Sequence, residues 1–141
     1  MEAGVAFDPA WMLQGEPTIP GGHALTHELL AQPGPRPTAI FCVGDLMAIG
    51  ALRALYEVGI QVPGDMAIVG FDGILLGQFT TPALTTMNQP RAEMSRLAAD
   101  MLFDLLDGHQ PTSSEQVLSA ELLVRESSGA VARVKSGIDP S

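Results

Sequence analysis

Two aspartates follow short apolar runs and are the side chains best placed to bind a ligand. Asp45 comes just after the run 39–43, and Asp72 directly follows the run 66–71. If the runs are strands of a parallel sheet, both carboxylates lie at the strand ends beyond which such sheets bind ligands. An ionised carboxylate accepts two charge-assisted hydrogen bonds, which suits the hydroxyl groups of a polyol. Each aspartate also has a purely local interpretation, as a cap of the following helix for Asp45 and as a turn residue for Asp72.

Other reactive side chains do not form a catalytic or metal-binding pattern. His23 and His27 have the i, i+4 spacing that puts two imidazoles on one helix face, but Glu28 is off that face and no cysteine joins them. Ser127 has no associated base or nucleophile elbow, and no P-loop lysine follows the glycines of segment 70–73. The sequence therefore predicts no metal, no cofactor and no enzymatic activity.

The composition of the 141-residue chain excludes several kinds of partner. Sixteen acidic and seven basic residues give a net charge of −9, which repels phosphate backbones. A free-standing DNA-binding domain is therefore not expected. The single cysteine, Cys42, lies in an apolar run and is interpreted as a buried, inert thiol that fits a reducing cytoplasm. With no bilayer-spanning run or signal peptide in the sequence, we expect a cytoplasmic protein without a membrane partner.

Apolar periodicity predicts the elements that position the two aspartates. The runs 39–43 and 66–71 are typical of parallel strands buried on both faces, and a helical pattern that starts at Asp45 connects them. This order predicts an α/β fold with an open parallel sheet and flanking helices. The other expected elements are a strand at 4–7, a helix from Gly21 to about residue 31, a strand at 84–87, a helix at 90–107 and a final strand at 117–124.

Several segments in register resemble the LacI/GalR family of transcriptional regulators. None of them decides the matter alone, but together they span residues 36–127. The segments are Arg36–Phe41, Gly44–Leu52, Gly59–Asp65, Val69–Asp72, Pro82–Thr86 and Leu123–Ser127.

The resemblance implies a fragment of the C-terminal subdomain of an effector-binding core, of the periplasmic-binding-protein type I-like fold. Such a core clamps a small effector, often a sugar or nucleoside-like molecule, between two subdomains. Residues 1–129 would then be a partial effector-binding and dimerisation domain, and 130–141 a flexible tail. DNA would be contacted only through a helix-turn-helix headpiece that this chain lacks.

The resemblance also assigns four candidate effector-binding residues. Asp72 matches the strand-end aspartate that commonly accepts hydrogen bonds from ligand hydroxyls, and Asp45 matches the second residue of the family's Asn-Asp pair. Gly44 replaces the asparagine of that pair, which puts a direct side-chain contact there in doubt. Pro17 stands where the family often has an aromatic residue that stacks on the effector. These departures suggest a different ligand or a looser alignment at the start of the chain.

The family resemblance further implies a homodimer. Family dimers use the helix after the Asn-Asp pair and the loop before the Leu-Thr-Thr segment, which here implicates Ile49, Arg53, Phe79, Thr80 and Pro82. The isolated fragment could therefore be a dimerisation module that binds no ligand.

The amphipathic helix 90–107 has a broad apolar face that something must cover. In family members this helix packs on the N-terminal subdomain, which is missing here. We expect the helix either to fold back on its own fragment or to pack against another chain. The alternative interpretation is an ordinary, self-contained core helix.

Two other classes of protein stay open at this point. A periplasmic sugar-binding protein shares the fold and the ligand class, although the Val-Arg-Glu-Ser segment at 124–127 favours the regulator. A doubly wound enzyme would need a nucleophile, metal or cofactor fingerprint that the sequence does not offer.

Overall fold

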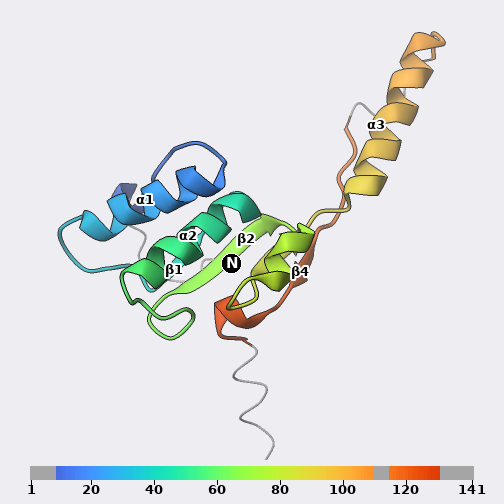
Figure 1. Cartoon of the computed structure of the whole chain (residues 1–141). Coiled ribbons are helices and arrows are strands. Elements are labelled where there is room, and N and C mark those ends of the chain that lie inside the picture. Colours follow the sequence, from blue (N-terminus) through green and yellow to red (C-terminus); the bar gives the residue numbers. More distant parts are fainter. Residues whose placement is uncertain (1–8, 110–114, 131–141) are drawn as a thin grey trace, which may run out of the picture.

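A computed structural model of the chain describes residues 9–109 and 115–130. Within these residues the strands form one sheet in the order β1-β2-β3-β4 (Figure 1). The elements are the 3-10 helix η1 (Pro9–Trp11), α1 (Ile19–Ala31), β1 (Ala39–Phe41), α2 (Asp45–Glu57), β2 (Ala67–Asp72), η2 (Leu75–Phe79), β3 (Thr85–Asn88), α3 (Arg91–Leu106), β4 (Glu121–Leu123) and η3 (Glu126–Ser128).

The predicted open sheet with flanking helices is confirmed, with one difference in strand direction. β1, β2 and β3 are parallel to one another, but β4 is antiparallel to β3. The antiparallel strand arises because the chain turns back after α3 and runs toward the sheet again (Figure 1). β4 is also shorter than the strand expected at 117–124.

The other boundaries lie close to the expected ones, and α1 shows why one of them shifted. The helix begins at Ile19 rather than Gly21, because the Thr18 hydroxyl accepts a hydrogen bond from the backbone N–H of Gly21 and caps the helix. Pro20 fits in this first turn, where its missing N–H has no partner to lose. The strand expected at 4–7 and residues 131–141 of the tail expected at 130–141 lie outside the described residues.

The core lies between α2 and the sheet. Ala48, Leu55, Ile68 and Leu84 are completely buried there. α1 packs against the outer side of α2, with two glycines at the crossing. A Cβ atom added to Gly22 would lie 2.1 Å from the carbonyl oxygen of Met47, and one added to Gly50 would lie 2.0 Å from that of Ile19. Glycine at both positions allows the two backbones to touch.

The expectation that β1 is buried on both faces is wrong. Ile40 and Cys42 pack into the core, whereas Phe41 and Val43 alternate to the other face and are 62% and 69% exposed. The ring of Phe41 meets the ring of Phe71 edge to face on that side, with centroids 6.5 Å apart. A parallel strand is buried on both faces only where both are covered, and the described residues cover one face of β1.

Cys42 is buried, as predicted. Burial, and secondarily the charge of Asp45, raises the pKa of its thiol to about 11. Because the thiolate is the reactive form, this thiol is inert near neutral pH.

The segment Arg125–Ser128 fastens the C-terminal end of the described chain to the sheet. The Ser127 hydroxyl is fully buried, donates to the carbonyl of Ile68 (2.7 Å) and accepts from the N–H of Thr85 (2.8 Å). The Glu126 carboxylate accepts from the N–H of Ala83 (2.9 Å). The Arg-Glu-Ser segment is thus occupied with structural hydrogen bonds.

The helix α3 extends away from the sheet (Figure 1). None of its residues is buried in the described structure, and Leu102, Phe103 and Leu106 are 56%, 63% and 72% exposed. The interpretation of α3 as a self-contained core helix is therefore wrong, because the helix bends away from the core instead of joining it. Within the described residues α3 does not fold back on the sheet either, so that alternative is wrong, and packing against another chain stays a prediction.

Candidate functional site

The carboxyl ends of β1 and β2 meet as the sequence predicted, and two of the candidate residues lie together there. Gly44, the N-cap of α2, is buried beside Asp72, so that a Cβ atom added to Gly44 would lie 3.3 Å from the Asp72 Oδ2 atom. Asn88, at the end of β3, is the register partner of Asp72. The three strand ends therefore form one polar edge.

Asp72 is held in an unusual conformation at this edge. Its φ angle is 121°, a region that residues with a side chain rarely adopt and that functional sites often retain. Its Oδ1 atom accepts a hydrogen bond from the Gln89 side-chain amide (2.8 Å), and its carbonyl accepts one from the Arg91 guanidinium. Within the described residues, Oδ2 has no hydrogen-bond partner and is free to accept one from a ligand.

Sequence reasoning missed Gln89 and Arg91. Both follow β3, at the same edge as Asp72, so the rule that directed attention to the ends of β1 and β2 applies equally to the end of β3. The strand predicted at 84–87 ends before Gln89 and Arg91. Examining the residues after this strand, as was done for the other two strands, would have identified both.

Asp45 lies at the same end of the sheet but is completely buried. Its Oδ1 atom accepts from the Thr86 hydroxyl (2.6 Å), and its Oδ2 atom accepts from the backbone N–H of Ile74 (2.8 Å). The local interpretation of Asp45 as the side-chain cap of α2 is not what the structure shows, because α2 begins at Asp45 and these partners lie elsewhere in the chain. The carboxylate instead joins α2 to β3 and to the loop that follows Asp72.

Pro17 lies apart from this network. It is exposed, directly before the N-cap of α1, and has no hydrogen bond to Asp72 in the described part of the chain. The structure therefore brings Asp72, Gly44 and Asp45 together and leaves Pro17 outside their contacts.

A cavity of about 480 Å³ lies between α3 and the segment 115–120, and its lining includes Phe71 and Gln89 but not Asp72 itself. These two lining residues are linked to Asp72. Phe71 precedes it in sequence, and the Gln89 side chain donates a hydrogen bond to it. Met94, Leu97, Met101 and Leu118 supply apolar walls. Apolar walls with a few convergent polar groups are typical of small-molecule sites.

The candidate dimer residues lie on a second surface, formed by α2 and the loop 79–82. Arg53 is exposed, stacks over the Tyr56 ring at 5.6 Å and donates to Glu57 (2.7 Å). Hydrogen bonds, first from His23 and then from Arg53, lower the pKa of Glu57 to about 2.

The other candidate dimer residues differ in exposure. Phe79 is 72% exposed. Ile49, Thr80 and Pro82 are partly buried.

Known proteins share the fold and part of the sequence of this chain. The family model for the periplasmic binding protein-like domain matches residues 1–128. The chain belongs to this family. The HTH-type transcriptional repressor CytR of Escherichia coli (strain K12) is a relative, 41% identical over 128 residues, which are 91% of this chain and 37% of CytR.

Solved structures of family members superpose on the chain. The transcriptional regulator CelR in complex with cellobiose gives a TM-score of 0.82 at 36% identity and covers 89% of this chain and 38% of CelR. A LacI family transcriptional regulator from Arthrobacter sp. FB24, in complex with lactose, gives 0.69 at 36% identity and covers 80% of this chain and 42% of its own.

These comparisons confirm the resemblance to LacI-type regulators that the sequence motifs predicted, and they confirm the fold. The chain spans 37% of the length of CytR. No described helix of this family member is both long and apolar enough to cross a membrane.

Proposed function

We propose that the chain is the effector-sensing and dimerising part of a LacI-type transcriptional repressor and that Asp72 binds a sugar-like effector. Binding would take place in the cytoplasm, without catalysis. It would change the angle between two subdomains and thereby the operator affinity of a DNA-binding headpiece outside this chain. The names of the relatives, which are HTH-type transcriptional repressors, favour this function over a periplasmic sugar-binding protein or an enzyme.

The open carboxylate oxygen of Asp72 carries the proposal. This side chain sits at the ligand-binding edge of a parallel sheet, in a strained backbone conformation that Gln89 and Arg91 help to hold. The lactose and cellobiose complexes of the relatives support a carbohydrate as the ligand class. The apolar cavity that Phe71 and Gln89 line, next to Asp72 in sequence and through a hydrogen bond respectively, offers a surface for the less polar face of a sugar ring.

Replacing Asp72 by asparagine should weaken effector binding about 10- to 100-fold, because hydrogen bonds to a charged group contribute about 1.5–3 kcal/mol. The measurement is isothermal titration calorimetry, in which a panel of mono- and disaccharides is titrated into the proposed regulator that includes this chain. Glu28→Gln, the same carboxylate-to-amide change at an exposed position of α1, is the matched control. Equal affinities of Asp72→Asn and Glu28→Gln for the bound sugar, or no binding across the panel, would contradict the proposal.

The surface of α2 and the loop 79–82 favours dimerisation as the second part of the function. A groove of about 400 Å³ runs between them, lined by Leu52, Tyr56, Ile60 and Pro82. Two exposed aromatic side chains belong to this surface, Tyr56 on α2 at 76% and Phe79 at the start of the loop 79–82 at 72%. Aromatic side chains are enriched at the centres of interfaces.

Phe79→Ser should shift the monomer–dimer midpoint of the 141-residue chain to at least tenfold higher concentration. The measurement is light scattering coupled to size-exclusion chromatography over a concentration series. Met12→Ser is the matched control, since Met12 is likewise 72% exposed but lies away from the groove. A dimer that survives Phe79→Ser and dissociates on Leu106→Ser would place the interface on α3 and overturn the assignment.

A further inference from the structure

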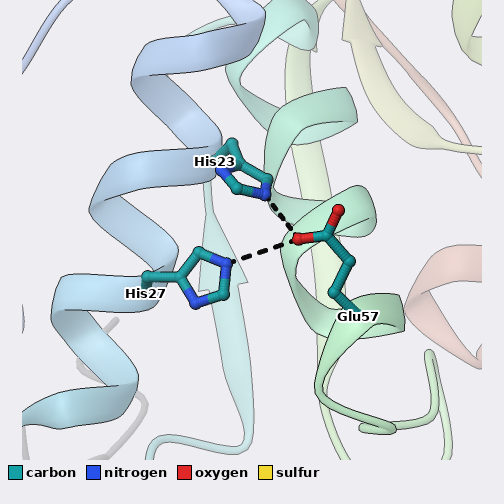
Figure 2. A group of neighbouring side chains, drawn as sticks. All are labelled: His23, His27 and Glu57. Atoms are coloured by element: carbon teal, nitrogen blue, oxygen red, sulfur yellow. Dashed lines mark hydrogen bonds and ion pairs between the residues drawn. The ribbon is translucent and has the colours of Figure 1, made fainter.

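A cluster of metal-ligating side chains lies at the α1–α2 junction. His23 and His27 extend from one face of α1, and Glu57, the last residue of α2, reaches between them (Figure 2). The Glu57 Oε2 atom is 2.7 Å from His23 Nε2 and 3.6 Å from His27 Nε2. One ligand atom from each residue lies within 4.8 Å of the other two.

The sequence did not reveal this cluster because its carboxylate comes from another helix. Spacing alone places the two imidazoles together, and the only nearby acidic residue, Glu28, is off their face. Glu57 is 34 residues from His23 and reaches it because α1 and α2 cross closely at Gly22 and Gly50. The tertiary crossing therefore supplies the ligand that the local pattern lacked.

We propose that His23, His27 and Glu57 bind a divalent transition-metal ion of the zinc class. Two imidazoles and one carboxylate are a ligand set that Zn²⁺ takes in proteins, usually with a water or a further ligand in the fourth position. Bonds of about 2.0–2.2 Å in a tetrahedron separate the ligand atoms by about 3.3 Å. The distance from Glu57 to His27 is already close to this value, and the His23 hydrogen bond must lengthen by about half an ångström. The ligand atoms of the two histidines lie within 4.8 Å of each other and must come as close as the other pairs when an ion binds.

The surroundings allow this adjustment. The three side chains are 35%, 42% and 35% exposed, so an ion can enter from solvent and the side chains have room to rotate. Arg53 donates from its Nε atom to Glu57 Oε1 (2.7 Å), which leaves Oε2 directed at the imidazoles. Arg53 is thus a positioning residue, while its positive charge weakens the attraction of the site for a cation.

The test is calorimetric titration of ZnCl₂ into the 141-residue chain, purified without a polyhistidine tag. We expect one equivalent to bind. His27→Gln and Glu57→Gln should each weaken binding at least tenfold. His109→Gln, which changes the remaining histidine at an exposed position outside the cluster, should leave binding unchanged. Melting curves without zinc show whether each variant is folded.

Cobalt provides a second readout that a general loss of structure would not imitate. Co²⁺ in a tetrahedral or five-coordinate site of this kind should show intense visible absorption, which His27→Gln and Glu57→Gln abolish and His109→Gln keeps. Arg53→Gln should retain this spectrum, since Arg53 is not a ligand. Zinc binding that is the same in the parent chain and in His27→Gln, or that is lost equally in His109→Gln, would overturn the proposal.

Discussion

Replacing Asp45 by alanine should lower the free energy of unfolding by about 3–5 kcal/mol. The Asp45 carboxylate is completely buried and accepts hydrogen bonds from the Thr86 hydroxyl and the Ile74 N–H. Alanine would leave both donors without a partner, at about 1–3 kcal/mol each, and would open a small cavity. The measurement is urea unfolding followed by circular dichroism. A loss of this size is a large fraction of the stability of a small domain.

Two further variants show whether the loss of stability comes from the buried hydrogen bonds of Asp45 or from removing any carboxylate. Asp45→Asn keeps one oxygen acceptor in place, so it should destabilise less than Asp45→Ala. Asp65→Ala removes a carboxylate that accepts one hydrogen bond, from the Gln61 N–H at an exposed turn, and should lower stability by less than about 1 kcal/mol. If Asp45→Ala and Asp65→Ala have the same small effect, Asp45 does not hold α2 to β3.

The case of Asp45 shows where local sequence reasoning stops. The apolar runs and the aspartates after them predicted the strands and the polar edge, because both depend on residues that are neighbours in sequence. The partners of Asp45 are 29 and 41 residues away, and no local pattern indicates which donors a buried carboxylate will meet. Helix capping was the local explanation available, and the tertiary contacts replaced it.

The exposure of one face of β1 and the approach of Glu57 to the histidines both depend on how the helices pack, which local sequence patterns do not indicate. An all-apolar run is compatible with burial on both faces, but the number of faces covered depends on which helices pack there. Likewise, the histidine spacing on α1 was visible in the sequence, while the approach of Glu57 depends on how α1 crosses α2. The close crossing at Gly22 and Gly50 is therefore the feature on which both the packing and the proposed metal site depend.

Gly50→Ala should lower the free energy of unfolding by about 3 kcal/mol, although alanine favours a helix by about 1 kcal/mol over glycine. The added Cβ atom would lie 2.0 Å from the carbonyl oxygen of Ile19 and 2.7 Å from the backbone nitrogen of His23. Both are backbone atoms of α1, so the clash can be relieved only by separating the helices. Urea unfolding measures the change in the free energy of unfolding. We expect a decrease, whereas helix propensity alone would predict an increase.

Gly64→Ala is the matched control, since the nearest atoms to its added Cβ belong to the Gln61 side chain at 3.7 Å. Its effect should stay within about 0.5 kcal/mol. If Gly50→Ala is as mild as this control, the helices are not in tight contact. Separation of α1 from α2 also moves His23 and His27 away from Glu57, so Gly50→Ala should weaken zinc binding although it changes no ligand. A destabilised Gly50→Ala chain that still folds and binds zinc with the parent affinity would show that the histidine–glutamate cluster does not depend on this crossing.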